Sequence, residues 1–477
     1  MPSMHPTRRR ILPGLIIGWA ATLAGCDLGR RPSAAREHAI YEVVGPDAEG
    51  KRRRVEAWNR RYGEAAGTLL THVPPPPAYR HAGRRATARL LLDERAQGTP
   101  PGIVWIEHES VPDLARHRAV RGLDDFVRRD RLDLKRFMPC ALQPCFGLDD
   151  RLVSLPDEVD AGQLYFNRRH VLEAGIDFRR AGLDFERPDS TWENLRRAAL
   201  DLQLGRRAAD QAPWHPGAAG IAVWGWANGG GWVTPDGRRA TFARDENVSA
   251  LAWLVRAAQE AGGPSRVPDV EQLPGPALHG TDADRVAGHP FLDGRLSLWF
   301  DSGRFMSTLA RMRPDFPIGY VESPRRHARS PLVTWARSSG YALRAGSPDA
   351  LWPALRFLVG EDAAIVDASA EAAQAPASAA SGRPLWFPPF TGQLRADRFL
   401  ASRYRIDLKI MDEGRDHALE QLRHARPSER CPAPEEIWLL VRAAQRAALR
   451  GASARESLED ARRRAQEILD VSWRGTR

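Results

Sequence analysis

The sequence predicts an α/β protein with two lobes, and three observations lead to this prediction. The chain has 477 residues, which is more than one hydrophobic core usually serves. Hydrophobic residues make up 43% of it, enough to fill two cores. Predicted strands and helices alternate between residues 40 and 106, which indicates a parallel sheet with helices packed on its faces.

The alternation begins with a strand at residues 40–44 and a helix at residues 50–61. A second strand spans residues 68–73 and ends at a run of four prolines, which cannot continue a ladder of hydrogen bonds. A helix at residues 86–97 then leads to residues 102–106. This last run is almost wholly apolar, as is typical of a strand buried inside a parallel sheet.

The N-terminus has the pattern of an export signal. Arginines at residues 8–10 precede an apolar run at residues 11–23, which is too short to anchor a protein in a bilayer. The run ends in small residues and Cys26, and this ending resembles a bacterial lipobox. We expect residues 1–25 to be a lipoprotein signal peptide, Cys26 to receive the lipid, and residues 26–37 to form a polar tether. The alternative is an ordinary signal peptide with a chance cysteine.

The chain is basic, with a formal net charge of +10 from 70 basic and 60 acidic residues. The two signs are mixed along the chain without a sustained basic block, so we expect no nucleic-acid partner. Nearly all of the basic residues are arginines, and lysine occurs only at positions 51, 135 and 409.

Three cysteines follow Cys26 in the sequence. A disulfide between Cys140 and Cys145 is compatible with an exported protein, and the sequence leaves this question open. Cys431 would then remain free or compete for one of the other two. No cysteine or histidine pair has the spacing of zinc ligands, so we expect neither a metal nor a cofactor.

Residues 147–194 carry several short patterns in a fixed order. They are Leu155-Pro156, Glu158, the strand at residues 164–168, residues 173–176, and Thr191-Trp192-Glu193. In this order and spacing the patterns resemble the extracellular solute-binding proteins of ABC importers, in the sugar-binding group that includes the maltose-binding protein. The resemblance extends from about residue 38 to residue 470.

The resemblance implies a two-lobed periplasmic-binding-protein fold, with three crossing segments and a ligand cleft between the lobes. Residues 38–157 and 301–358 would form lobe 1, and residues 158–300 and 359–477 would form lobe 2. The crossings would lie near residues 154–162, near residues 296–302, and at about Val359. The resemblance also implies a non-enzymatic, monomeric receptor that binds a sugar or oligosaccharide and delivers it to an ABC permease. The receptor would lie in the cell envelope, tethered to the membrane through its lipid.

Sugar recognition requires aromatic faces for the rings and polar groups for the hydroxyls. The positions that resemble family contacts and meet these needs are Trp105, Glu107, Glu158, Asp160, Trp224, Trp226, Trp232, Asp301, Arg304, Ser339, Tyr341, Arg383 and Trp386. Residues 223–232 hold three tryptophans and four glycines, which favours a loop with exposed aromatic faces over a helix or strand. Any single tryptophan could instead belong to a core.

Two alternatives stay open at this point. The same fold could bind a phosphorylated sugar through Arg304 and Arg383, or a polyamine through its acids. A surface-anchored glycoside hydrolase would need two carboxylates flanking the scissile bond, for which Glu158 with Asp160, or Glu107 with Asp301, are the candidate pairs. No sequence pattern fixes two acids in one cleft for that chemistry.

Overall fold

The computed structural model describes most of the chain beyond residue 38. The described residues are 39–46, 48–79, 86–94, 100–179, 181, 183, 190–205, 212–214, 220–262, 289–303, 305, 306, 309, 315–380, 390–403 and 409–474. The expected signal peptide, Cys26 and the tether lie outside these residues, as do three of the expected ligand contacts, Arg304, Arg383 and Trp386.

The first sheet has the strand order β2-β1-β3-β8-β4. Its strands are β1 (Ala39–Val44), β2 (Thr68–Val73), β3 (Gly102–Glu107), β8 (Thr334–Leu343) and β4 (Leu155–Asn167). β1 pairs with β2 and β3 in parallel, whereas β8 is antiparallel to both β3 and β4. All six residues of β3 are buried, so the predicted interior parallel strand is confirmed.

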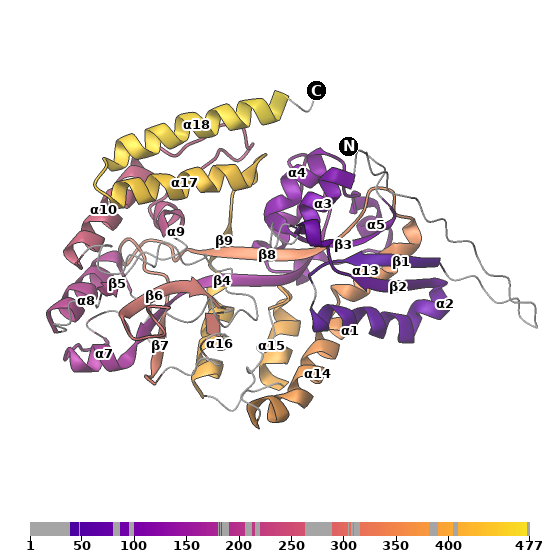
Figure 1. Cartoon of the computed structure of the whole chain (residues 1–477), viewed down its shortest axis with the longest axis horizontal. Coiled ribbons are helices and arrows are strands. Elements are labelled where there is room, and N and C mark those ends of the chain that lie inside the picture. The colour runs from indigo at the N-terminus through magenta and orange to yellow at the C-terminus, as the bar shows by residue number, and fades with distance from the viewer. Residues whose placement is uncertain are drawn as a thin grey trace, which may run out of the picture. The chain divides into compact units, whose positions relative to one another are not determined.

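The second sheet is built around the other half of β4. Residues 155–161 of β4 pair with β8, whereas residues 162–167 pair with β6 (Leu296–Ser302) and β7 (Ile318–Val321). β5 (Ala212–Trp214) adds to the far edge of β6 in parallel. A single 13-residue strand therefore belongs to both sheets (Figure 1).

β8 pairs with β4 up to the point where the two sheets meet. Its end near Leu343 pairs with β3, and its start at Thr334 pairs with β9 (Ala425–Pro427). Within the described residues β6 pairs only with β4 and β5, inside the second sheet. β7, which was expected in lobe 1, pairs with the second-sheet half of β4. The expected lobe boundaries and the crossings at residues 296–302 and at Val359 stay predictions.

Helices cover both faces of the first sheet. The face that carries Trp105 and Tyr341 packs against residues of α1, α5 and α13, whereas the face that carries Val104 and Ile106 packs against α3 and α4. The helical elements of this part are α1 (Glu49–Trp58), η1 (Asn59–Gly63), α2 (Glu64–Ala66), α3 (Ala86–Glu94), η4 (His108–Ser110), α4 (Val111–Arg116), α5 (Asp124–Arg129), η5 (Leu134–Arg136), α6 (Pro139–Leu142), η6 (Gln143–Cys145), η9 (Asp349–Leu351), α13 (Trp352–Leu358) and α14 (Glu361–Ala380).

The second sheet also has two covered faces. Leu164 and Phe166 point into a core shared with α8, α9, α10, α17 and α18, whereas Tyr165 packs with α16 on the other face. The helices of this part are α7 (Arg168–Glu173), α8 (Trp192–Gly205), α9 (Gly220–Ala227), α10 (Asp245–Glu260), α15 (Leu394–Arg403), α16 (Lys409–Gln421), α17 (Pro434–Leu449) and α18 (Ala454–Arg474). No helix within the described ranges combines the length and the apolar content that a membrane span requires.

The glycine-rich tryptophan segment is buried, which contradicts the predicted exposed loop. Trp224 and Trp226 lie on α9 and are 4% and 3% exposed, and Trp232 is fully buried. A Cβ atom on Gly225 would lie 2.7 Å from the Trp232 ring. The glycine therefore makes room for a neighbouring indole, and its role here is close packing.

The cysteines of the described residues are buried free thiols, which answers the question of a disulfide between Cys140 and Cys145. The thiol of Cys140 donates to the carbonyl of Leu422 at 3.2 Å, and that of Cys145 donates to the carbonyl of Ala141 at 3.4 Å. Burial raises the pKa of both thiols, so they are protonated and unreactive at neutral pH.

Candidate functional site

Polar side chains gather on β4 and β8 next to the point where β4 passes from the first sheet into the second. Asp160 on β4 lies opposite Arg337 on β8, and Glu158 lies opposite Ser339. Ser339 also faces Glu107, the last residue of β3. Because alternate residues of a strand share one face, Asp160 and Glu158 lie on the same side of β4, and Arg337 and Ser339 lie on the same side of β8.

Arg337 lies opposite Asp160 and feels the charges of three further carboxylates, and we call this group the junction cluster: Glu107, Glu109, Asp160, Asp301 and Arg337. Glu109 lies on η4 just after β3, and its Oε1 is 3.4 Å from Nε of Arg337. Removal from water lowers the pKa of Arg337, but the four carboxylates more than compensate and raise its pKa above the usual value. The guanidinium is therefore a fixed positive charge in an acidic setting.

Asp301 is a buried acid of the junction cluster with a perturbed pKa. Burial raises its pKa to about 6, although Nε1 of Trp299 and the backbone N–H of Ser302 both donate to the carboxylate, at 2.9 and 2.6 Å. The side chain is 4% exposed and gains or loses its proton near neutral pH.

We expect the pKa of Asp301 to make stability depend on pH. The folded state holds this proton up to about pH 6, whereas the unfolded chain releases it near pH 3.8. Stability from this group is therefore present at low pH and falls as pH rises from about 4 to 6, by on the order of 3 kcal/mol. Asp301→Asn should flatten that part of the profile of unfolding free energy against pH, measured by urea titration. The exposed control Asp125→Asn should leave it unchanged, and an unaltered slope in Asp301→Asn would contradict the assignment.

A small cavity of about 30 Å³ adjoins the cluster, lined by Glu109, Arg337 and Glu429 among others. Nε1 of Trp226 donates to Oε1 of Glu429 at 2.9 Å, and Arg426 donates to the same oxygen. Trp226 is thus linked to the lining of this cavity through Glu429, although its ring belongs to the core.

A second buried group of charges lies beside the junction cluster, on α1, β4 and α14. We call it the lysine network: Lys51, Arg54, Asp157, Glu158 and Asp367. Lys51 pairs with Asp157 and, at 2.8 Å, with Glu158, while Arg54 bridges Asp157 and Asp367. Lys51 and Arg54 are each 5% exposed. Burial lowers the pKa of Lys51, but the two carboxylates outweigh it and raise this pKa overall.

Two expected ligand contacts are part of the surroundings of this network. Nε1 of Trp105 donates to Asp157 at 3.2 Å, and the ammonium of Lys51 lies 4.9 Å from the Trp105 ring centre and 5.4 Å from that of Tyr341. Both rings are buried, at 3% and 1% exposure. Trp105 and Tyr341 therefore contact the lysine network and belong to the core that α1 and α13 cover.

The expected site residues thus divide into three described groups. Glu107, Asp160 and Asp301 come together in the junction cluster, with Ser339 next to them on β8. Glu158, Trp105 and Tyr341 belong to the lysine network or pack on it. Trp224, Trp226 and Trp232 lie in the core of the second sheet.

Three functional candidates were missed by sequence reasoning. Arg337 lies two residues before Ser339 on the same strand face, so the alternation of a strand, applied to Ser339 and Tyr341, could have found it. Glu109 follows Glu107 by two residues after a buried strand. Lys51 is one of only three lysines among 70 basic residues. A lysine in a chain that otherwise uses arginine could have marked this position as a functional candidate.

The arrangement of the two sheets recurs in known structures, although no family model matches the sequence. A cyclic α-maltosyl-1,6-maltose binding protein from Arthrobacter globiformis superposes with a TM-score of 0.64 at 16% identity, covering 91% of this chain and 100% of that one. A substrate-binding protein from Listeria monocytogenes in complex with cycloalternan gives 0.64 at 14% identity, covering 90% and 98%. The chain has the two-lobed fold of the ABC-importer solute-binding proteins.

A third structure with this solute-binding fold is UgpB from Mycobacterium tuberculosis in complex with glycerophosphocholine. Its TM-score is 0.64 at 16% identity, and the match covers 91% of this chain and 99% of that one. The first two are binding proteins by description, and the third is a complex with a small molecule. Identities this low establish the shared fold, so the ligand has to be argued from the side chains at the junction.

Proposed function

We propose that this protein is the substrate-binding component of an ABC importer and that it binds a sugar or oligosaccharide at the junction cluster. The observation that carries the proposal is the pairing of Asp160 with Arg337, next to the point where β4 passes from the first sheet into the second. Ligands of open α/β sheets bind at the carboxyl ends of the strands, and β3 ends there with Glu107.

The chemistry of the junction cluster suits a hydroxyl-rich ligand. Carboxylates accept hydrogen bonds from hydroxyl groups, and the guanidinium of Arg337 donates in a fixed fork. A buried polar group that loses its partner costs about 1–3 kcal/mol, so a sugar that presents hydroxyls to these groups is favoured over an apolar molecule of the same size. The proposed contacts are Glu107, Asp160, Asp301 and Ser339, to which the structure adds Glu109 and Arg337.

The proposed cycle needs no catalytic step. Two lobes that close about β4 and β8 would trap the ligand, and the closed form would be the one that an ABC permease recognises. We further propose that residues 1–25 are removed, that Cys26 carries a lipid, and that the monomeric receptor works at the outer face of the cytoplasmic membrane.

A cationic ligand such as a polyamine is the second candidate. The observation in its favour is charge, because one guanidinium stands among four carboxylates in the junction cluster. The glycerophosphocholine complex shows that this fold accommodates a charged ligand in another protein. A hydrolase is less well supported, because Glu158, one of its four candidate carboxylates, is paired with Lys51.

Binding measurements on two variants separate these candidates. Neutral oligosaccharides, such as maltotriose and mannotriose, and spermidine would be screened by thermal shift, since a ligand at a hundredfold excess over its Kd stabilises by about 2.7 kcal/mol. For a sugar, Asp160→Asn and Arg337→Gln should each weaken binding by about tenfold or more, because each removes a charge-assisted hydrogen bond. For a polyamine, Asp160→Asn should weaken binding whereas Arg337→Gln should strengthen it, since a repelling charge is removed.

The exposed substitutions Asp125→Asn and Arg256→Gln serve as matched controls, and both should bind like the parent. Calorimetry with any ligand found in the screen gives the dissociation constants. If the variants at positions 160 and 337 bind that ligand as tightly as the parent does, the ligand site lies elsewhere. Release of a shorter sugar from the oligosaccharide would favour the hydrolase.

A further inference from the structure

A second cavity lies apart from the junction cluster, on the face of the first sheet that α1 and α13 cover. Its volume is about 760 Å³, within the range of small-molecule sites. The wall is formed by α1 and the helical turns after it, by the turn between α13 and α14, by Arg136, and by the start of α15. None of the junction-cluster residues lines it.

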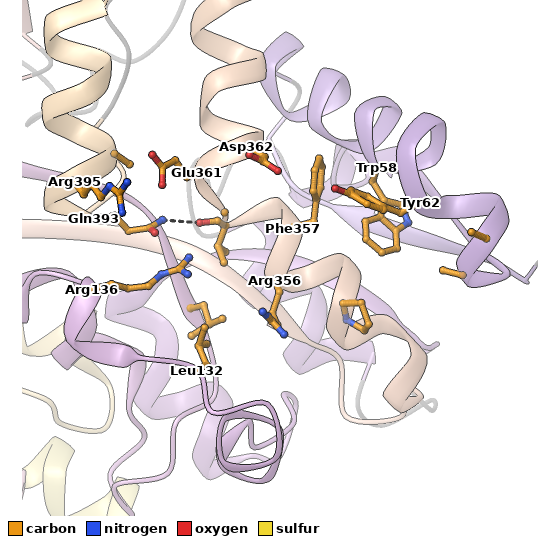
Figure 2. A pocket seen from close by; sticks show the side chains of 17 residues that line it. Trp58, Tyr62, Leu132, Arg136, Arg356, Phe357, Glu361, Asp362, Gln393 and Arg395 are labelled. Carbon is orange, nitrogen blue, oxygen red and sulfur yellow. Dashed lines mark hydrogen bonds between the residues drawn. The ribbon is translucent and has the colours of Figure 1, made fainter.

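One end of this cavity is aromatic. Trp58, Tyr62 and Phe357 form a triangle, with ring centres 5.5, 5.7 and 5.8 Å apart (Figure 2). Trp58 and Phe357 are buried, whereas Tyr62 is 44% exposed and presents its ring to the cavity. An exposed aromatic ring supported by two buried ones offers a rigid surface on which a flat apolar group can stack.

The other end is basic. Figure 2 shows Arg136 and Arg395 grouped around Gln393, whose amide nitrogen donates to the carbonyl of Val359 at 2.8 Å. Among the described residues, neither Arg136 nor Arg395 has an acidic group within 4.0 Å, so both guanidiniums have donors to spare. The guanidinium of Arg136 lies over the ring of Phe137, 5.0 Å from its centre.

The remaining charges of the wall have partners or lie at its rim. Arg356 pairs with Asp130 at 2.9 Å, and Asp362 lies 4.0 Å from Arg61. Three arginines line the cavity against two acids, Glu361 and Asp362, so the lining has an excess of positive charge. Burial, and after it the charge of Arg356, lowers the pKa of Arg136.

We propose that this cavity binds an amphipathic anion, a ligand with a flat apolar body and one carboxylate, sulfonate or phosphate group. The apolar body of the ligand would stack on the exposed ring of Tyr62, which Trp58 and Phe357 support. The anionic group would accept hydrogen bonds from Arg136 and Arg395. Paired guanidiniums recognise planar or tetrahedral oxyanions through charge-assisted, bidentate hydrogen bonds. The site is separate from the proposed sugar site and does not depend on it.

The test compares two fluorescent probes that differ in the anionic group. Anilinonaphthalene sulfonate carries the charge, and N-phenylnaphthylamine has nearly the same body without it; both brighten when they leave water. The sulfonate should bind the native protein at least about tenfold more tightly than the neutral probe, as loss of a charge-assisted hydrogen bond predicts. The double variant Arg136→Gln/Arg395→Gln should remove that preference and leave the affinity for the neutral probe unchanged.

Two further variants complete the test. Tyr62→Ala should weaken both probes, because it removes the stacking surface. Arg256→Gln, an exposed arginine on α10 outside the cavity, should change neither. Circular dichroism confirms that each variant is folded, which is expected since the substituted arginines form no ion pair with any acid that the structure describes. Equal affinity of the native protein for the two probes, or an unchanged sulfonate affinity in the double variant, would overturn the proposal.

Discussion

Replacing Lys51 with methionine should destabilise the protein by about 3–5 kcal/mol, the usual cost of breaking a buried ion pair from one side. The ammonium of Lys51 is the shared partner of Asp157 and Glu158, and all three side chains are nearly inaccessible to water. Methionine fills much of the same volume, so the loss comes from the two carboxylates that are left with fewer compensating charges. Urea-induced unfolding, followed by circular dichroism, measures the change.

Lys135 provides the matched control, because it is exposed and has no ion pair among the described residues. Lys135→Met should change the unfolding free energy by less than about 0.5 kcal/mol, as surface substitutions usually do. Equal effects of the two substitutions would mean that the lysine network contributes nothing specific. A gain of stability in Lys51→Met would show that the lysine network does not stabilise the packing of α1 on β4.

Replacing Trp232 with alanine should cost about 3–5 kcal/mol of stability, because a fully buried indole leaves a large cavity behind. Its ring packs edge-on against Phe242, with centres 5.7 Å apart, and against Trp438 at 6.3 Å. The affinity of the remaining folded protein for its ligand should change little, since the ring lies in the core of the second sheet. Thermal unfolding and calorimetric titration separate the two effects.

Leu204→Ala is the comparison for this variant, as Leu204 is 79% exposed and its truncation should be nearly neutral. If Trp232→Ala instead kept its melting temperature and lost ligand binding, the segment at residues 223–232 would be a binding surface after all. That result would restore the prediction that the sequence pattern alone suggested.

The local patterns of the sequence predicted the strands of the first sheet well. β1, β2 and β3 lie within a residue or two of the expected ranges, because an apolar run bounded by glycine or proline is a local property. The partners of a strand are not a local property. β6 and β8 are both apolar strands that end near small or polar residues, and only their partners distinguish them: β6 pairs inside the second sheet, and β8 pairs with β3 and β4.

The same limit explains the tryptophan segment. Three glycines in a row favour a loop by local conformational freedom, yet Gly225 and Gly230 have a different role. A Cβ atom on Gly230 would lie 2.0 Å from the amide oxygen of Asn247, a residue of α10. Such a close approach depends on the fold and cannot be seen in the ten residues themselves.

The sequence could predict those residues of the candidate site that lie at or near a recognisable strand end or motif. Glu107 closes β3, and Asp160 follows the Leu155-Pro156 pattern, so both could be selected from the sequence. Their partner Arg337 lies 177 positions after Asp160, by subtraction of the two numbers, and only the β4–β8 register brings them together. Lys51 reaches the same region from α1, and no spacing rule in the sequence indicates this contact.

The packing of the second sheet's core has an optical consequence. The rings of Trp192, Trp214, Trp224 and Trp253 lie with centres 4.8–6.2 Å apart. Indoles this close share their excited states, so the protein's circular dichroism should contain an exciton couplet on top of the peptide signal. Energy will also migrate among these rings before emission. The intrinsic fluorescence of the chain is therefore a gauge of whether the second sheet's core is intact, and a dye attached near the junction cluster is the better reporter of ligand.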